Sequence, residues 1–147
     1  MICQLEDYEM SIEANTNAAR AGYAAFGRGD MQGVLAQLDE AIEWVTPLVE
    51  GQAGSGTKHG HAGVLEFFQA VAASWEFEAF EPREYIASGD LLAVVGYYRA
   101  KSRKTGRVAE SPWVMVWRFR NGKCIHFQEY TDTAALTKAL AGSAAVA

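Results

Sequence analysis

The sequence contains few of the residues that mark several classes of protein. It has two cysteines, three prolines and three histidines in 147 residues. Two cysteines are too few for a disulfide framework, so Cys3 and Cys124 are expected to be reduced, which favours a cytoplasmic location. No apolar run is long enough to span a membrane. The first ten residues are acidic and lack the basic start of a secretory signal.

Positive charge is also scarce. Lys and Arg number 13 against 18 Asp and Glu, and the net charge of −5 provides no basic surface for nucleic acid. His59 and His61 lie in a glycine-rich stretch, but no cluster of Asp, Glu or Cys nearby completes a metal site. His61 also suits the start of a helix. We therefore expect no nucleic-acid partner and no metal.

Hydrophobic periodicity predicts helices in the first half of the chain and strands in the second. Apolar residues at helical spacing indicate helices over 11–28, 31–38 and 61–75. A short strand over 41–47 and a loop over 48–60 with four glycines separate the last two of these helices. Alternating patterns then predict strands over 77–87, 91–101, 111–120 and 123–131. The turn Asn121-Gly122 joins the last two strands, and Asp132 begins a final helix over 133–140.

This order of elements predicts an α+β fold. Three N-terminal helices would pack on one face of a curved, mainly antiparallel sheet. The length suits one domain, which we place at residues 10–141. Met10 precedes a better helix start, so residues 1–9 are expected to be a disordered extension, and residues 142–147 a frayed tail.

Large aromatic residues share one face of the predicted strands. Trp113, Met115 and Trp117 alternate along one strand, and Trp44 and Thr46 share a face of the early strand. Such rows commonly fill a hydrophobic core. They could instead line a pocket for an apolar or ring-shaped ligand, together with Phe68 and Trp75 from the third helix.

Glu129 distinguishes these two interpretations. In the segment IHFQEYT it follows Ile125 and Phe127 on the more apolar face of the last strand. A carboxylate on a core face must be paired, solvated or neutral, because an isolated buried charge is costly. Desolvation would raise its pKa and suit it to general acid–base catalysis. Alternatively, Glu129 reaches water at the strand end or pairs with an arginine such as Arg99.

Three hydroxyl groups are secondary candidates for such a site. Tyr23, Tyr98 and Thr46 could each donate a hydrogen bond into a pocket. Each could equally be a core residue with one satisfied hydrogen bond, which is the commoner case.

Several segments together resemble a known family. These segments are AAFGRGDMQGVLAQLDEAIEWVTP, HGHAGVLEFF, SGDLLAVVGYYRA, TGR and VWRFRNGKCIHFQEYTDTAAL, and they span most of residues 18–140. In this order they resemble the SnoaL-like and ketosteroid-isomerase-like proteins of the nuclear transport factor 2 superfamily. The last segment, with its N-G-K turn and a strand ending in E-Y-x-D, is the most specific.

The resemblance implies a cone-shaped α+β barrel around a deep apolar pocket. It also implies a homodimer formed through the outer face of the sheet. The residues that would then look inward are Trp44, Thr46, Trp113, Met115, Trp117 and Glu129. Those that would form the dimer interface are Val114, Val116, His126, Gln128 and Tyr130.

The family's catalytic positions transfer only in part. In ketosteroid isomerases the general base is an aspartate before a proline on the early strand, and Thr46 occupies that position here. Their oxyanion-hole tyrosine would fall at Gly22, next to Tyr23, and their protonated aspartate at Met115. The resemblance to steroid isomerases therefore does not extend to their catalytic residues.

Glu129 is the position that does transfer. It matches the last-strand aspartate of limonene-epoxide-hydrolase-like enzymes, whose arginine and second aspartate would fall near Gly96 and Tyr98. SnoaL-like polyketide cyclases also place an acid–base aspartate on a late strand. We therefore expect a pocket for a small apolar molecule, with Glu129 as a cofactor-free acid–base catalyst. A non-catalytic ligand-binding protein and a dimeric interaction module with a filled pocket are the alternatives.

Overall fold

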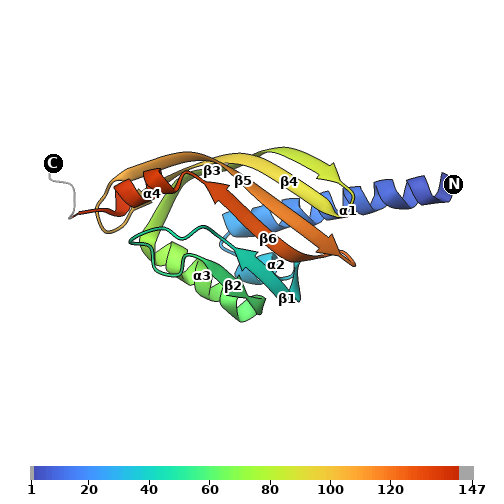
Figure 1. Ribbon diagram of the computed structural model, residues 1–147, viewed down its shortest axis with the longest axis horizontal. Helices are drawn as coiled ribbons and strands as arrows, with labels where there is room; N and C mark the ends of the chain where they lie inside the picture. Colours follow the sequence, from blue (N-terminus) through green and yellow to red (C-terminus); the bar gives the residue numbers. More distant parts are fainter. Residues whose placement is uncertain (1, 143–147) are drawn as a thin grey trace.

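The computed structural model describes residues 2–142. It contains four helices and six strands (Figure 1). The helices are α1 (Ile2–Gly27), α2 (Met31–Leu35), α3 (Gly60–Ser74) and α4 (Thr133–Leu140). The strands are β1 (Leu38–Val45), β2 (Thr57–His59), β3 (Trp75–Ser88), β4 (Leu91–Ser102), β5 (Val108–Arg120) and β6 (Lys123–Thr131).

All six strands form one sheet in the order β2-β1-β6-β5-β4-β3. Neighbouring strands are antiparallel except β1 and β6, which pair in parallel. The sheet curves over helices α1, α2 and α3, which confirms the predicted α+β class (Figure 1). It does not close into a barrel, because β2 and β3 remain as its two edges.

The β5–β6 hairpin forms where the sequence predicted it. Asn121 has φ 51° and Gly122 has φ 78°, and a two-residue turn that matches strand twist requires positive φ at both positions. The inward row of β5 is also confirmed, with Trp113, Met115, Trp117 and Phe119 all buried. In β6, however, the register shifts, so that Arg118 pairs with His126 and Phe119 with Cys124.

This bulge corrects one expectation about β6. Cys124 is fully buried and Ile125 only partly, so the inward side chains of β6 are Cys124, Phe127 and Glu129 rather than Ile125, Phe127 and Glu129. The extra residue at Ile125 breaks the strict alternation on which the expected row Ile125–Phe127–Glu129 depended. The part of the row that carries Glu129 is unaffected.

Strand β3 is longer than predicted. It runs through Pro82, with register shifts between Phe77 and Ala79 and between Pro82 and Glu84. A proline is tolerated here because β3 is an edge strand, where one side of the backbone has no partner. The shifts bend the strand and contribute to the curvature of the sheet.

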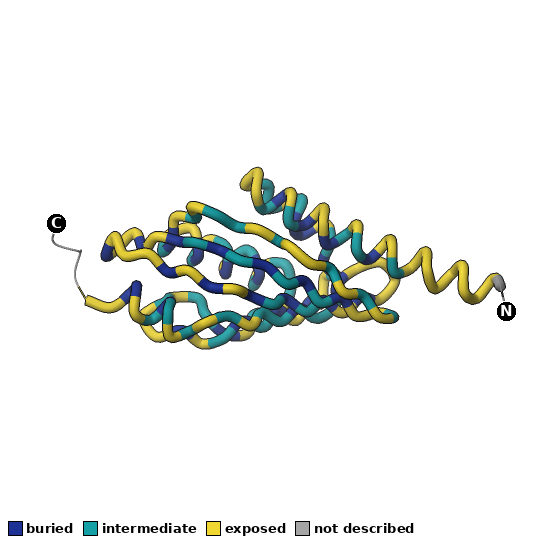
Figure 2. Tube along the Cα trace, turned by 90° about the horizontal axis from the view of Figure 1, so that it is seen from above, coloured by how far each residue is buried: buried dark blue, intermediate teal, exposed yellow. Residues whose placement is uncertain are grey.

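Helix α1 differs most from its expected bounds. It begins at Ile2, so residues 2–9, expected to be a disordered extension, are helical. This first part projects beyond the sheet and is exposed (Figures 1 and 2). A hydrogen bond joins it to the β3–β4 turn, where the backbone N–H of Gly89 donates to the Tyr8 hydroxyl at 3.0 Å. Burial against the sheet begins at Asn15 and Ala19. Of the expected C-terminal tail, residues 143–147 lie outside the described residues.

Aspartate side chains cap the starts of two helices, and the one at Asp132 was expected from the sequence. The Asp30 carboxylate accepts the Gly33 N–H at 3.0 Å at the start of α2, and the Asp132 carboxylate accepts the Ala135 N–H at 3.1 Å at the start of α4. Helix α2 ends at Leu35, three residues earlier than expected, because β1 already begins at Leu38. Within residues 2–142, no helix is both long and apolar enough to cross a membrane.

Candidate functional site

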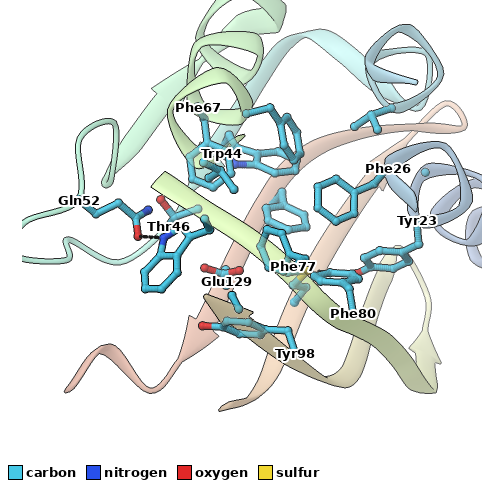
Figure 3. A pocket seen from close by; sticks show the side chains of 18 of the residues that line it. Tyr23, Phe26, Trp44, Thr46, Gln52, Phe67, Phe77, Phe80, Tyr98 and Glu129 are labelled. Atoms are coloured by element: carbon cyan, nitrogen blue, oxygen red, sulfur yellow. Dashed lines mark hydrogen bonds between the residues drawn. The ribbon is translucent and has the colours of Figure 1, made fainter. Parts of the chain in front are cut away.

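A cavity of about 90 Å³ lies between the concave face of the sheet and the helices α1 and α3 (Figure 3). Its wall is mostly aromatic. The lining residues are Gly22, Tyr23, Phe26, Val34, Trp44, Thr46, Gln52, Phe67, Phe68, Val71, Trp75, Phe77, Phe80, Tyr98, Ala100, Met115, Trp117, Phe127, Glu129 and Leu136. An apolar wall with a few polar groups is typical of small-molecule sites.

The aromatic side chains hold one another in place. The Trp44 ring stacks on Phe127, with centroids 3.8 Å apart and planes 8° apart. Phe26 and Phe80 lie 4.9 Å apart, centroid to centroid. Because these rings are large and interlocked, the cavity wall is built from side chains with little rotational freedom.

Glu129 is the acidic residue of the cavity wall. Strand β6 places it directly opposite Met115 of β5. The register Val45↔Gln128 brings Thr46, the residue after β1, to the level of Glu129. The residue is partly accessible, since it borders the cavity, yet burial of the carboxyl group raises the pKa of Glu129 to about 7. Desolvation disfavours the charged form, and no cation within residues 2–142 offsets it.

Arg99, the suggested partner of Glu129, lies elsewhere. It forms ion pairs with Glu78 at 3.3 Å and with Glu110 at 2.5 Å on the exposed side of the sheet. The alternative in which Glu129 pairs with this arginine is therefore wrong. The Glu129 carboxyl group points into the aromatic cavity instead (Figure 3).

Tyr23 has a hydroxyl group that a ligand could use. Its O–H donates to the Met115 sulfur at 3.3 Å and accepts the indole N–H of Trp117 at 2.9 Å. Burial raises the pKa of Tyr23 well above its usual range, so the hydroxyl stays protonated. A thioether is a weak acceptor, and a carbonyl oxygen in the cavity would compete well for this proton.

The hydroxyl groups of Tyr98 and Thr46 are more firmly engaged. Tyr98 shares a 2.7 Å hydrogen bond with the Thr131 hydroxyl. Thr46 donates to the Gly56 carbonyl at 3.0 Å and accepts the Gly56 N–H at 3.2 Å. Both residues border the cavity, but these bonds tie the sheet and the β1–β2 loop together.

The structure brings the predicted site residues together, with one exception. Tyr23, Trp44, Thr46, Phe68, Trp75, Tyr98, Met115, Trp117 and Glu129 all line the cavity. Trp113 does not. Its ring stacks on Phe80 at 5.1 Å and lies over Gly96, where an added Cβ would come within 2.2 Å of Trp113 Cζ2.

Sequence reasoning missed several residues of the wall. Phe127 was assigned to the apolar row of the last strand and Phe26 falls within the first predicted helix, but neither was assigned to the site. The register shift after Phe77 puts both Phe77 and Phe80 on the cavity side, which strict alternation does not predict. Gln52 belongs to the glycine-rich loop, where no periodicity indicates which side chains turn inward.

The histidines take no part in this cavity. His61 lies in the first turn of α3, where its Nε2 is 2.9 Å from the Leu38 carbonyl oxygen. Among the residues that the structure describes, no three His, Cys, Asp or Glu side chains cluster as metal ligands would.

Comparisons with known proteins agree with this architecture. Residues 19–127 match the family of SnoaL-like domains. An NTF2-like protein of unknown function from Burkholderia pseudomallei is 35% identical, with a TM-score of 0.80 over 88% of this chain and 98% of that one. TerC, in a crystal structure with polyporic acid, is 33% identical, with a TM-score of 0.74 over 86% of this chain and 98% of that one. Curated proteins include no match.

The family match covers most of the cavity wall and the strands that carry it. The chain therefore belongs to the SnoaL-like family, within the proteins that share the NTF2-like fold.

Proposed function

We propose that this protein binds a small, mostly apolar molecule in its aromatic cavity and moves a proton on it with Glu129. The observation that carries the proposal is the Glu129 carboxyl group in a cavity wall of aromatic rings. The co-crystallisation of TerC with polyporic acid supports a small-molecule role for this fold.

The state of Glu129 suits it to proton transfer near neutral pH. With a pKa of about 7, the carboxyl group is divided between its acid and base forms at pH 7. A group in this balance can take a proton and return it without a large energetic cost in either direction. The chemistry needs no cofactor.

Tyr23 supplies the second group that such a reaction uses. As the Glu129 carboxylate removes a proton from the carbon next to a ligand carbonyl, negative charge develops on the carbonyl oxygen. The Tyr23 O–H can turn from the Met115 sulfur to this oxygen, while the Trp117 N–H holds the phenol in place. Glu129 then returns the proton to another carbon of the ligand, which completes an isomerisation. In a cyclisation the enolate carbon first bonds to a second carbonyl carbon of the ligand, and Glu129 returns the proton to the alkoxide oxygen that this attack produces.

The main alternative is a binding protein without turnover. The open cavity of about 90 Å³ beside Glu129 favours this alternative over the interaction module with a filled pocket. In a binder, Glu129 would be a hydrogen-bonding anchor for the ligand rather than a base.

Exchange of carbon-bound hydrogen tests the proposal directly. Wild-type protein and the variant Glu129→Gln are incubated in D₂O with a panel of small cyclic ketones and enones, and deuterium uptake is followed by NMR. We expect wild type to exchange at least one ketone, and the variant to lose 100-fold or more of that rate, in line with the contribution of general-base catalysis.

Tyr23→Phe is the matched variant for the oxyanion role. It keeps the aromatic ring and should reduce exchange about 10- to 100-fold, with binding changed much less. Exchange that is absent with every ketone in wild type, while several bind, would establish the binding-protein alternative. Equal rates in wild type and Glu129→Gln would remove Glu129 from the chemistry.

A further inference from the structure

We infer that Gln52 selects the ligand together with Glu129, and that the two side chains fit a molecule carrying a carbonyl next to a hydroxyl group. In this arrangement, before any proton transfer, the Gln52 amide donates to the ligand carbonyl next to the hydroxyl group, and Glu129 accepts from that hydroxyl. The Tyr23 hydroxyl remains available for a different carbonyl oxygen of the ligand. The inference rests on the proposed function, since it places the ligand in the same cavity.

The loop that carries Gln52 is folded by its own hydrogen bonds. The Gln52 N–H donates to the Val49 carbonyl at 3.1 Å, and the Ser55 hydroxyl lies 3.1 Å from the Gln52 carbonyl. The Thr46–Gly56 pair of bonds closes the base of this loop. Gln52 is therefore held in place although it lies between β1 and β2 in a glycine-rich segment.

A tryptophan fixes which way the Gln52 amide points. The indole N–H of Trp75 donates to Gln52 Oε1 at 3.0 Å (Figure 3). An indole nitrogen can only donate, so the amide oxygen must face Trp75 and the NH₂ group must face away from it. Gln52 borders the cavity, and no hydrogen bond among the described residues uses its NH₂ group, which is therefore free to donate to a ligand.

Gln52 and Glu129 belong to the same end of the cavity. The parallel register of β1 and β6 puts Thr46 at the level of Glu129, and the loop after Thr46 carries Gln52. Figure 3 shows Gln52, Thr46 and Glu129 in one half of the view, and Phe26, Tyr23 and Phe80 in the other. We call this part of the cavity, which Trp44 and Phe67 also border, the polar end (Thr46, Gln52 and Glu129).

The free hydrogen-bonding groups at the polar end define the ligand class. The Thr46 hydroxyl is used by Gly56, which leaves the Gln52 NH₂ as a donor and the Glu129 carboxylate as an acceptor. The indole N–H of Trp44, also in the cavity wall, has no partner among the described residues and is a second donor for the ligand carbonyl. A ligand with an adjacent carbonyl and hydroxyl satisfies the donors and the acceptor, as in an α-hydroxy enone or an enolised diketone. A ligand without the hydroxyl would leave the carboxylate desolvated and unpaired.

Single-ring probes test the inference. Tropolone carries adjacent carbonyl and hydroxyl groups, tropone lacks the hydroxyl, and 2-methoxytropone blocks it. Isothermal titration at pH 7 should show tropolone binding to wild type at least tenfold more tightly than either analogue. The variant Gln52→Glu keeps an acceptor for Trp75 but loses the donor, and it should weaken tropolone binding tenfold or more.

Two further variants make the result specific. Gln52→Met removes the donor without adding charge and should weaken tropolone binding to a similar extent. Gln32→Glu makes the same charge change at an exposed position of α2 and should bind tropolone as wild type does. Thermal melting establishes that each variant is folded.

The opposite results would overturn the inference. Equal affinity for tropolone and tropone would show that the hydroxyl is not recognised, while the cavity and the role of Glu129 could stand on the exchange assay. Wild-type affinity in Gln52→Met would remove Gln52 from ligand selection. No binding of any probe to wild type would reject this ligand class, and hydrogen exchange on other ketones would then decide the proposed function separately.

Discussion

Ionisation of the buried Glu129 carboxyl group lowers the free energy of unfolding of the protein. Its pKa is about 7 in the fold, against 4.5 for an ordinary glutamate. Between these two pH values the folded state holds a proton that the unfolded state has lost, so the free energy of unfolding falls as pH rises. The contribution of Glu129 is therefore most favourable below pH 4.5 and is lost by the time pH exceeds about 7. The total loss is about 3 kcal/mol.

We expect the variant Glu129→Gln to remove this pH dependence, because an amide does not ionise. Urea unfolding of both proteins at pH 5 and pH 8 measures it. The variant should be more stable than wild type at pH 8 by about 2–3 kcal/mol, and the difference should shrink at pH 5. A constant difference between the two pH values would mean that the Glu129 carboxyl group is well solvated in the folded protein.

At the scale of the elements, Gly96 of β4 leaves room for the Trp113 ring of β5, which lies directly over it. A Cβ at Gly96 would lie 2.2 Å from Trp113 Cζ2, and the ring has no space to withdraw because Phe80 stacks on it. Gly96→Ala should lower the free energy of unfolding by about 2–3 kcal/mol through overpacking.

Gly27→Ala is the matched control for this change. Gly27 is the last residue of α1, and a Cβ there has no heavy atom within 4 Å. Stability should stay the same or rise by up to about 1 kcal/mol, since alanine favours the helix. Chemical denaturation of both variants measures the contrast, and equal effects would mean that the Trp113 packing is looser than the structure shows.

The elements that the sequence predicted well are those specified by local patterns. The β5 row and the Asn121-Gly122 turn depend on neighbours within a few residues, and both are as expected. The bulge at Ile125 and strand β2 depend instead on which strand lies alongside, and no local pattern encodes that. The sequence therefore predicted the class of fold but not the full sheet.

The same division applies to the candidate site. Glu129 was predicted because it interrupts an apolar row, which is a local signal. Gln52 was not, because its place depends on the hydrogen bonds of a loop and on the distant Trp75. Trp113 was correctly predicted to face inward, but it does not line the cavity because Phe80 stacks on its ring.

For the whole molecule, we propose that two copies associate through the outer face of the sheet. Val114, Val116 and Gln128 are only partly buried on this face, and Tyr130 is 53% exposed. A two-fold symmetric pairing of this largely apolar strip would cover it on both copies at once.

Val116→Lys tests this association. The added charge would be buried in the dimer, so light scattering at micromolar concentration should show a shift from dimer to monomer. Gln32→Lys adds the same charge on exposed α2 and should leave the mass unchanged. A wild-type protein that is already monomeric at high concentration would reject the proposed dimer.

The parallel pairing of β1 with β6 also constrains the order in which the sheet assembles during synthesis. Synthesis releases β1 long before β6, and between them come β2 to β5. One edge of β1, which carries Ile42 and Trp44, therefore stays unpaired until the last strand leaves the ribosome. Contacts this distant in sequence slow folding. The polar end of the cavity, where Thr46 meets Glu129, is thus among the last features of the nascent chain to assemble, and a chain that stops short of β6 has no binding site at all.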